Sequence, residues 1–279
     1  MKAFPVTILC EVMRVSRSGF YDYLFRYLDD NGPGEAELKS RIKEIFNNSG
    51  QSYGSRRIVK QLQAEGHQIG RYKVRRIMRQ LNLKAIIPRR FKRTTDSKHS
   101  FPVAPNILDQ KFDVDTPNKV WTADISYVWT FEGWLYLAVV MDLHSRQIVG
   151  WAMNERMKKQ LVIDALAMAY WQRKPSKGLL HHSDRGSQYA SYDYQNLLES
   201  YGMQASMSRK GNCWDNAPME RFFRSLKSER IDHYRFFTRN EAKNEILDYI
   251  TFYNSIRLHS TLGYLSPMEY EKEQYLKVA

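Results

Sequence analysis

The spacing of apolar residues along the first third of the chain follows the period of a helix. Helical patterns cover residues 36–48, 55–65 and 71–82. In the third pattern, four apolar residues recur at i, i+3, i+4 and i+7 and should face a small core. They are Val74, Ile77, Met78 and Leu81. Residues 66–70, bounded by glycines, are typical of a turn between the last two patterns. The spacing predicts a small all-α domain of helix-turn-helix type at residues 35–83.

A second face of the last of these helices is basic. Arg71, Arg75 and Arg79 recur every four residues, as expected of a recognition helix that lies along DNA. The alternative is a solvated charged surface, but the acidic residues that would form i,i+4 pairs with these arginines are absent. We therefore expect Arg71, Arg75 and Arg79 to bind DNA.

Two further segments flank this domain. Residues 1–34 have the pattern of a short helix, a turn and the start of a second helix, which the run Asn31-Gly-Pro-Gly34 should end. A mobile N-terminal segment is the alternative. Residues 84–112 are basic, contain several prolines and show little periodicity, so they are expected to form a linker that follows DNA phosphates.

From residue 113 onward the pattern changes to strands, and then to alternating helices and strands. Strand-like runs cover residues 119–130, 134–142, 147–153, 178–183 and 203–208, and helical runs cover residues 158–173, 190–201, 215–229 and 240–254. Three consecutive strands followed by alternating helices and strands are the order of a ribonuclease-H-like α/β domain. The expected fold is therefore a mixed five-stranded sheet with helices at residues 113–279, preceded by the small all-α domain.

Positive charge is concentrated in one part of the chain. The 279 residues include 43 Lys and Arg against 30 Asp and Glu, a net charge of +13. Between Arg56 and Lys98 there are 14 Lys and Arg but only Glu65 and Asp96 as acids, which leaves +12 in this stretch. This stretch should therefore face a polyanion such as double-stranded DNA, whereas the rest of the chain is nearly neutral.

The sequence argues against disulfide-rich, zinc-binding and membrane classes. Cys10 and Cys213 are its two cysteines, and neither lies in the Cys and His spacing of a zinc site. No apolar stretch approaches the roughly 20 residues that a membrane span requires. The N-terminus also lacks the long apolar region and cleavage site of a signal peptide. We expect a cytoplasmic protein without a membrane partner.

Three carboxylates stand in positions that suggest a metal site. Asp124 interrupts an apolar strand run, Asp184 follows a short apolar run, and Glu220 lies in a helical run. A carboxylate inside a buried strand costs several kcal/mol unless it is paired or holds a metal. Carboxylates brought together from two strands and a helix would suit Mg²⁺ or Mn²⁺. Any one of them alone would be taken as an ordinary exposed carboxylate, so the inference depends on all three.

Four motifs, three of which contain these carboxylates, resemble a known family. They are Trp121-Thr-Ala-Asp124, His182-Ser-Asp184-Arg-Gly186-Ser-Gln-Tyr189, Gly211-Asn-Cys-Trp-Asp215-Asn-Ala-Pro-Met-Glu220-Arg-Phe-Phe-Arg-Ser-Leu-Lys227 and Tyr253-Asn254-Ser-Ile-Arg257-Leu-His259-Ser-Thr-Leu-Gly263-Tyr-Leu-Ser266-Pro267. With these motifs in order and 35 residues between Asp184 and Glu220, the chain resembles the OrfB transposases of the bacterial insertion-sequence-three family, which carry a DD(35)E integrase catalytic core. The weaker pattern Tyr53-Gly54-Ser55-Arg56-Arg57-Ile58 extends the resemblance to nearly the whole chain.

The resemblance implies a DDE-type polynucleotidyl transferase. Such a DNA transposase cleaves a strand at the end of its mobile element, and the freed 3′-hydroxyl then attacks another phosphodiester. Two Mg²⁺ ions, for which Mn²⁺ can substitute, would activate the attacking oxygen and stabilise the leaving oxygen. Asp124, held in a strand, is suited to bridge the two ions, while Asp184 and Glu220 would each hold one. Which ion each of the two outer carboxylates holds stays open.

Cations on the Glu220 helix are candidate DNA contacts. Arg224 and Lys227 follow Glu220 at i+4 and i+7, so they share its helical face. Lys227 also matches a basic residue of the family, which implies binding of terminal DNA; a solvated lysine is the alternative. Asp215 or Asn216 could cap this helix.

Several other residues are given structural interpretations. Trp214 is either a core residue or a base-stacking residue, and the core is favoured. Asp142 should serve a turn between two strands, with a place near the metals as the alternative. His181 and His182 precede Asp184 and should support it without binding metal. Three residues of the last motif are expected to be structural or to contact DNA. They are Asn254, Arg257 and His259.

Two other functions remain open, namely a sequence-specific DNA-binding regulator with an inert core and a hydrolytic nuclease of the same fold. The resemblance also implies a homo-oligomer on DNA, associated with the nucleoid, and an OrfA partner or fusion from an upstream frame. That partner would supply the main end-recognition and oligomerisation helices. The present chain begins with its own Met and has no evident heptad segment. We therefore expect it to be catalytically complete but poorly targeted alone.

Overall fold

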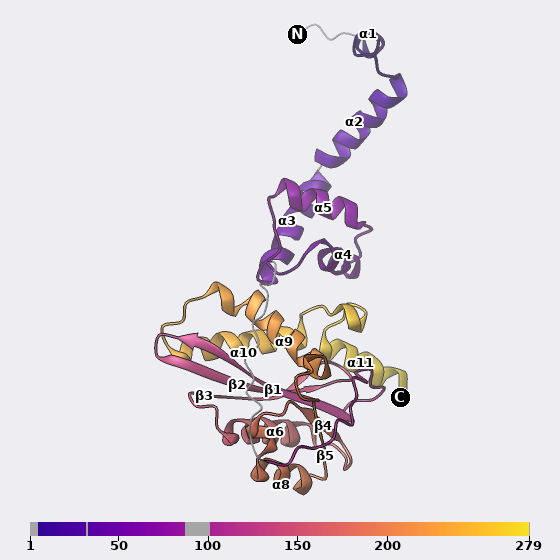
Figure 1. Cartoon of the computed structure of the whole chain (residues 1–279). Coiled ribbons are helices and arrows are strands. Elements are labelled where there is room, and N and C mark those ends of the chain that lie inside the picture. Colours follow the sequence, from indigo (N-terminus) through magenta and orange to yellow (C-terminus); the bar gives the residue numbers. More distant parts are fainter. Residues whose placement is uncertain (1–4, 32, 87–100, 279) are drawn as a thin grey trace. The chain divides into compact units, whose positions relative to one another are not determined.

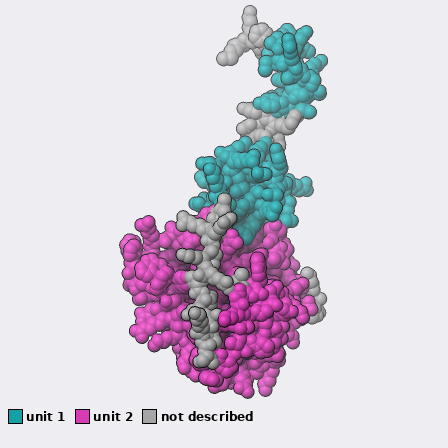
Figure 2. All heavy atoms as spheres, viewed as in Figure 1, with its two compact units in different colours: residues 1–85 teal, residues 86–279 magenta. Residues whose placement is uncertain are grey.

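The computed structural model describes residues 5–31, 33–86 and 101–278. It divides into two compact units, residues 1–85 and residues 86–279 (Figure 2). Each unit has a hydrophobic core of its own, as expected of a domain.

The described residues of the first unit are helical. The helices are α1 (Val6–Val12), α2 (Arg17–Asn31), α3 (Pro33–Asn48), α4 (Ser55–Ala64) and α5 (Arg71–Gln80). α1 and α2 confirm the helix, turn and second helix expected near the N-terminus. α3 begins at Pro33, which is favourable because a residue in the first turn has no intrahelical use for the N–H that proline lacks.

Helices α3, α4 and α5 share a small core. Its fully buried side chains include Ile42, Ile58, Leu62, Val74 and Ile77. The buried carboxylate of Glu35 on α3 forms an ion pair with Arg76 of α5 at 3.2 Å, which compensates the cost of burying the charge. α5 is therefore fixed on α3 by one face, while Arg71, Arg75 and Arg79 on another face are exposed.

The second unit is built on one five-stranded sheet. The strands are β1 (Val120–Thr130), β2 (Gly133–Asp142), β3 (Ile148–Asn154), β4 (Leu180–Ser183) and β5 (Gln204–Met207). Their order in the sheet is β3-β2-β1-β4-β5. β2 pairs antiparallel with β1 and β3, whereas β4 pairs parallel with β1 and β5. This mixed sheet confirms the fold class expected from the order of elements.

Helices cover both faces of this sheet. They are α6 (Lys159–Arg173), α7 (Ser187–Ala190), α8 (Tyr192–Ser200), α9 (Ala217–Glu229), α10 (Arg239–Ser255) and α11 (Pro267–Val278). α6 and α8 lie on one face, and α9 and α10 lie on the other (Figure 1). No separate pattern predicted α11. Among the described helices of both units, none is long and apolar enough to cross a membrane.

The alternation of side chains along β1 decides which residues face which layer. Trp121 and Ala123 pack with Leu166 of α6 in the main hydrophobic cluster. The next residues in the alternation, Thr122 and Asp124, therefore point to the opposite face, where α9 and α10 lie. The strand thus buries apolar side chains on one face and presents a carboxylate on the other.

β1 continues beyond the end of β4, which leaves part of its edge open within the sheet. β4 pairs with β1 only over the short stretch from Val120 to Thr122, whereas β1 runs to Thr130. At the far end, Phe236 forms an isolated bridge with Thr130, and the N–H of Phe131 donates to the Phe236 carbonyl at 3.0 Å. The edge of β1 is therefore open between its pairing with β4 and its bridge to Phe236, and Asp124 lies in this open part.

The stretch expected to be a linker, residues 84–112, includes residues 87–100, which lie outside the described residues. Its last part packs against the sheet. Leu108 is buried, and the N–H groups of Ile107 and Leu108 donate to Ser206 Oγ of β5 at 3.0 and 3.2 Å. This part of the stretch is therefore fixed on the second unit.

Candidate active site

Asp124 lies at the open edge of β1, on the face that α9 covers. Its Oδ1 accepts a hydrogen bond from the N–H of Ile125 at 2.8 Å. Two residues earlier, Thr122 donates from its hydroxyl to Asn216, the residue before α9. The strand therefore directs the Asp124 carboxylate toward the layer that contains Glu220.

Asp184 directly follows β4, and the register of the sheet brings it close to Asp124. His182 is the partner of Thr122 in the parallel pair, so Asp184 and Asp124 each stand two residues beyond the same paired position. Asp184 Oδ1 accepts the N–H of Gly186 at 2.8 Å. A Cβ at Gly186 would lie 3.0 Å from this oxygen, so glycine leaves the carboxylate room. This turn holds Asp184 at the carboxyl end of β4.

Glu220 is in the first turn of α9, and its side chain is exposed. The start of α9 is tied to β1 by Asn216, whose Nδ2 donates to the Ala123 carbonyl at 3.1 Å and whose Oδ1 accepts from Thr122. Asn216 does stand at the N-cap position, but its side chain forms no cap, because it bonds β1 instead. One turn later comes Glu220.

The three carboxylates influence one another electrostatically. Burial raises the pKa of Asp124 well above its ordinary value, and the charges of Asp184 and Glu220 raise it further. The N–H of Ile125 and the cation of Lys227 act in the opposite direction. A bound cation would therefore stabilise the ionised form of Asp124.

The chemistry of this donor set suits a hard divalent cation, for which carboxylate oxygens are the preferred ligands. Within the described ranges, however, no three His, Cys, Asp or Glu side chains are grouped closely enough to hold a metal ion. Carboxylates repel one another when no cation lies between them, and the exposed side chain of Glu220 has room to change rotamer. The chemistry of the residues present fits a divalent ion, which Asp124, Asp184 and Glu220 would hold once the Glu220 side chain turned toward the two aspartates.

Lys227, two turns after Glu220 on α9, lies beside the same strand. Its Nζ is 4.9 Å from the centroid of the Tyr127 ring on β1. Burial lowers the pKa of Lys227, while Asp232 and Asp124 raise it. Lys227 is therefore half-buried next to the carboxylates rather than fully solvated. Arg224, by contrast, is exposed on the surface of α9.

Sequence reasoning missed two tyrosines beside the carboxylates. Tyr127 provides the ring under Lys227, and its signal was its place three residues after Asp124. Tyr189 is buried on α7, five residues after Asp184, and the charges of Asp124 and Asp184 add to the burial that raises its pKa. Among the described residues, its buried hydroxyl has no hydrogen-bond partner. A buried hydroxyl near two carboxylates fits a site that holds a further polar group.

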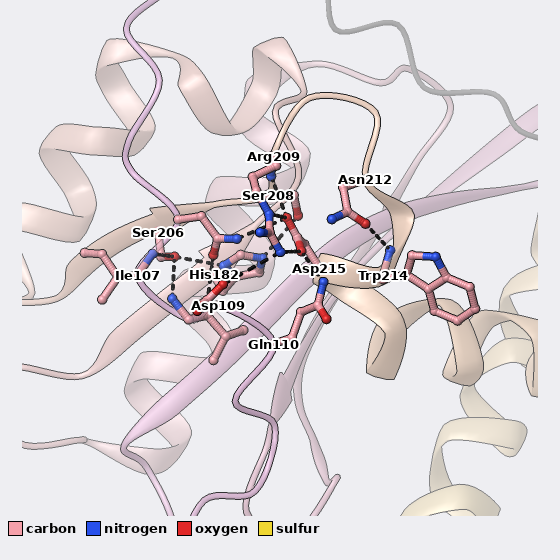
Figure 3. Close-up of polar contacts among 12 residues, drawn as sticks. Ile107, Asp109, Gln110, His182, Ser206, Ser208, Arg209, Asn212, Trp214 and Asp215 are labelled. Carbon is pink, nitrogen blue, oxygen red and sulfur yellow. Dashed lines mark hydrogen bonds and ion pairs between the residues drawn. The ribbon is translucent and has the colours of Figure 1, made fainter.

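Asp215 forms a buried hub one residue before Asn216. Its carboxylate accepts hydrogen bonds from the backbone and guanidinium of Arg209 and from the side-chain amides of Asn106 and Gln110, at distances from 2.7 to 3.0 Å (Figure 3). The hydrogen bonds from Arg209 hold the pKa of Asp215 well below its ordinary value. Asp215 therefore fixes the loop that leads into α9 and does not cap the helix.

The favoured interpretation of Trp214 as a core residue is wrong. Its side chain is 70% exposed and points away from the Asp215 hub (Figure 3). The sequence signal was misleading because a large aromatic residue is usually buried. Here the next two residues in the chain, Asp215 and Asn216, take the buried positions instead.

Asp142 and the two histidines are structural. Asp142 is fully buried at the end of β2 and accepts the N–H groups of Asn118 at 2.7 Å and His144 at 3.0 Å, as expected for a turn. His181 contacts the Tyr194 hydroxyl at 3.1 Å, and His182 contacts two serine hydroxyls at the end of β5. Burial lowers the pKa of His181 to about 3 and that of His182 to about 4.

Two residues of the last motif are also structural. Asn254 at the end of α10 exchanges two hydrogen bonds of 2.9 Å with the backbone of Ile148 on β3. Arg257 is buried and holds Glu229 of α9 by two hydrogen bonds, of 2.8 and 2.6 Å. The carboxyl end of α9 is thus fixed as firmly as its start.

Comparison with known protein families defines the class of the chain. Residues 114–213 match the model of an integrase core domain, residues 201–267 match a second integrase core domain model, and residues 34–91 match the model of an HTH-like domain. The sheet and the carboxylates therefore belong to an integrase catalytic core, in an enzyme related to polynucleotidyl transferases.

Curated relatives match the chain over almost its whole length. The chain is 46% identical, over 97% of its length and 100% of the relative, to "Insertion element IS600 uncharacterized 31 kDa protein" of Shigella sonnei. It is 40% identical, over 97% of its length and 95% of the relative, to "Transposase InsF for insertion sequence IS3A" of Escherichia coli strain K12. The chain belongs to this family of IS3 insertion-sequence transposases, and its function is DNA transposition.

Solved structures of viral integrases are more distant. A simian T-cell lymphotropic virus intasome in complex with PP2A regulatory subunit B56 gamma has a TM-score of 0.47 and 16% identity, over 69% of this chain and 64% of that chain. The HTLV-2 integrase catalytic core domain in complex with magnesium has a TM-score of 0.45 and 17% identity, over 56% of this chain and 97% of that chain. The assignment to the transposase family does not depend on them.

Proposed function

We propose that the second unit cleaves and joins DNA strands with Asp124, Asp184 and Glu220 as its catalytic metal ligands. The observation that carries this proposal is the buried carboxyl group of Asp124 at an open strand edge, destabilised by the charges of both other carboxylates. A structural role would supply such a carboxylate with several donors, as it does for Asp215. The substrate is the end of an insertion sequence together with its target DNA.

The three carboxylates differ in how firmly each is held, and this suggests a different role for each in binding metal. Two divalent ions, Mg²⁺ or Mn²⁺ in its place, would supply activation of the attacking oxygen and stabilisation of the leaving oxygen. Asp124, held in β1, is suited to bridge the two sites. Asp184, fixed by its turn with Gly186, lies on one side. Glu220 reaches in from α9 and completes the ligand set.

Lys227 is proposed to hold the DNA end during strand transfer. It lies half-buried beside Tyr127 and within electrostatic reach of Asp124. A cation at this place can neutralise a phosphate that enters the carboxylate site. Arg224, exposed one turn closer to Glu220, would contact the same strand further out.

The first unit is proposed to bind duplex DNA through Arg71, Arg75 and Arg79. All three are exposed on α5, and Arg71 Nε donates to Ser55 Oγ at the start of α4 at 3.3 Å. This contact joins the two helices of the helix-turn-helix. We propose residues 35–83 as the DNA-binding domain, residues 84–112 as a basic linker whose last part is fixed on the second unit, and residues 113–279 as the catalytic core.

The active form is proposed to be a homo-oligomer on DNA. An insertion sequence has two ends, and each strand-transfer reaction occupies one carboxylate site, so two catalytic units must meet to move one element. An upstream-frame OrfA partner or fusion would add end recognition. The complex would act on chromosomal DNA in the bacterial nucleoid.

The carboxylate assignment is tested by single replacements of Asp124, Asp184 and Glu220 with Ala. Each should abolish Mg²⁺-dependent cleavage and joining of a labelled element end while DNA affinity stays unchanged, because the phosphate contacts lie elsewhere. Each should also reduce the rise in melting temperature that Mn²⁺ causes in the full chain, since a ligand that binds the folded state stabilises it. Glu199→Ala, which removes an exposed carboxylate of α8, should change neither readout. Substantial joining by any of the three variants would reject the assignment.

A test of Lys227 distinguishes a transposase from a hydrolytic nuclease. Lys227→Ala should lower strand joining more than hydrolysis on one labelled oligonucleotide with Mn²⁺, because only joining requires the cut end to stay bound. Lys272→Ala, which removes an exposed lysine of α11, is the matched control. An equal loss of both products in Lys227→Ala would speak against an end-holding role.

The DNA-binding face is tested by the salt dependence of duplex affinity. Replacing Arg71, Arg75 and Arg79 together by Ala should flatten the slope of log K against log[salt] by about 2.7, at ~0.9 for each phosphate that these arginines neutralise. The control variant replaces three exposed lysines of the second unit, Lys111, Lys158 and Lys272. If the arginine variant kept the slope of the unchanged chain, the face would not bind phosphates.

A further inference from the structure

Trp214 is an exposed aromatic side chain held on a rigid loop at the entrance to α9. Single exposed apolar residues are common on protein surfaces, so its 70% exposure would by itself mean little. The loop around it is different from an ordinary surface loop, because the two residues after Trp214 are bonded to other parts of the second unit.

Two anchors fix this loop, and both follow Trp214. Before it, the Asn212 side chain accepts the N–H of Trp214 at 3.1 Å, which is a contact within the loop itself. After it, the fully buried carboxylate of Asp215 accepts hydrogen bonds from Arg209 and from two side-chain amides (Figure 3), and Asn216 bonds β1. A buried charge with this many donors orders the backbone. The indole therefore projects from a fixed base.

The position of Trp214 relative to Glu220 sets what can reach it. Trp214 lies in a short 3-10 turn and Glu220 in the first turn of α9, and the backbone leaves helical geometry at Asn216 between them. The rise per residue of the two helices therefore limits the separation of the two positions along the chain to about 10 Å. Successive nucleotides of a strand are spaced by about 3.4 Å or more, the value in a duplex, so a phosphodiester at the carboxylates has bases within about three nucleotides in reach of the indole.

The surroundings favour a nucleobase over a protein partner. Exposed cations occur on both sides of Trp214 in the chain, at Lys210 in the loop and at Arg221 and Arg224 on α9. Basic residues around an aromatic ring are the combination that binds unpaired nucleic acid, since the cations contact phosphates and the ring stacks on a base. A protein interface would instead have few charges at its centre.

We propose that Trp214 receives one unpaired base of the reacting DNA strand, within about three nucleotides of the phosphodiester at the carboxylate site. The proposal rests on Glu220 as an active-site residue. Stacking on the indole compensates the unpairing of that base and holds the strand in place while its 3′-hydroxyl reacts. Because every base has a stacking face, this contact adds affinity without selecting a sequence.

The test measures binding of the full chain to a labelled duplex that carries the element end, in Ca²⁺ and without turnover. Trp214→Ala should weaken binding about 5- to 150-fold, the effect of losing one stacked base, and Trp214→Phe should keep most of the affinity. The control is Trp171→Ala, which removes a tryptophan of α6 that is 65% exposed, and it should bind like the unchanged chain.

An abasic scan then identifies the base. Removing single bases along the reacting strand should cost the unchanged chain affinity at one position within about three nucleotides of the cut, and at that position Trp214→Ala should lose nothing further. A loss in Trp214→Ala that is equal at every abasic position would overturn the proposal, and so would a changed oligomeric mass with unchanged DNA affinity. Because this readout needs no catalysis, a failure of the Trp214 contact can be told apart from a failure of the metal-ligand assignment, which the Ala variants of the three carboxylates test.

Discussion

Replacing Arg257 by Met should strongly destabilise the second unit. Arg257 is 5% exposed and donates to both oxygens of Glu229 on α9, at 2.8 and 2.6 Å. Tyr249 of α10 donates to the same carboxylate at 2.8 Å. Methionine keeps the packing of the aliphatic part of the side chain. It removes the guanidinium group that pairs with the buried Glu229 carboxylate.

The expected cost follows from the burial of the pair. Breaking a buried, hydrogen-bonded ion pair from one side costs about 3–5 kcal/mol, most of it because a buried charge is left uncompensated. For a unit of this size each kcal/mol shifts the melting temperature by about 2–4 °C, so Arg257→Met should melt about 6–20 °C lower. The double variant Arg257→Met with Glu229→Gln should recover most of this loss, since the buried charge is removed as well and Tyr249 can still donate to the amide oxygen.

The measurement can be confined to the second unit, because all 6 tryptophans of the chain lie between Trp121 and Trp214. Intrinsic fluorescence during urea unfolding therefore follows this unit alone. The control is Arg224→Met, which removes an exposed arginine of α9. It should change the unfolding free energy by no more than about 0.5 kcal/mol. A loss below about 1 kcal/mol in Arg257→Met, well under the cost of breaking a buried pair, or no recovery in the double variant, would refute the reasoning.

Three further predictions concern the neighbourhood of the carboxylates. Burial lowers the pKa of His181 to about 3, so the folded state binds fewer protons than the unfolded state, and stability should fall as pH drops from about 6.5 toward 3. His181→Phe should make the dependence of the unfolding free energy on pH shallower by about 1.4 kcal/mol per pH unit between pH 6 and 4, and an unchanged slope would contradict the pKa assignment. Tyr189→Phe should leave the metal-free stability the same or higher but reduce the stabilisation by Mn²⁺, as measured by thermal melting; if the metal response is unchanged, the buried hydroxyl does not serve the site. Asn216→Ala should cost about 1–3 kcal/mol, because it leaves the buried Thr122 hydroxyl and the Ala123 carbonyl without this partner, and it should lower joining at saturating DNA without changing DNA affinity; unaltered joining would show that this contact does not position Glu220.

The sequence predicted the elements whose pattern is long and regular. β1 could be predicted because apolar residues surround Asp124 for the length of a strand, and α5 because its apolar and basic residues separate cleanly onto two faces. α11 has no comparable stripe; it reads Pro-Met-Glu-Tyr-Glu-Lys-Glu-Gln-Tyr-Leu-Lys-Val, and its place is decided by packing against α10. Local pattern therefore fails where tertiary contacts decide.

The residues of the candidate site could be predicted from the sequence, but the contacts that hold them in place could not. Asp124, Asp184 and Glu220 follow from motif and spacing, whereas the contact between Arg257 and Glu229 joins residues 28 apart, which no local period indicates. Trp214 fails for another reason, since the rule that large apolar residues are buried applies to the average and not to one residue on a loop. Its exposure becomes apparent only in the folded structure, in which the hydrogen bonds of Asp215 and Asn216 place these two residues in the interior instead.

The supports of α9 also explain why Glu220 alone among the three carboxylates is exposed. The helix is fixed at its start by Asn216 on β1 and near its end by Glu229 on Arg257, so its backbone has little freedom to move toward the aspartates. Asp124 and Asp184 each accept a hydrogen bond from a nearby backbone N–H. If the three carboxylates hold an ion as proposed, the side chain of Glu220 would have to supply the adjustment, and a glutamate has one more rotatable bond than an aspartate with which to do so. The proposed ligand set would then join two aspartates that are fixed on the sheet to one glutamate that adjusts from the helix.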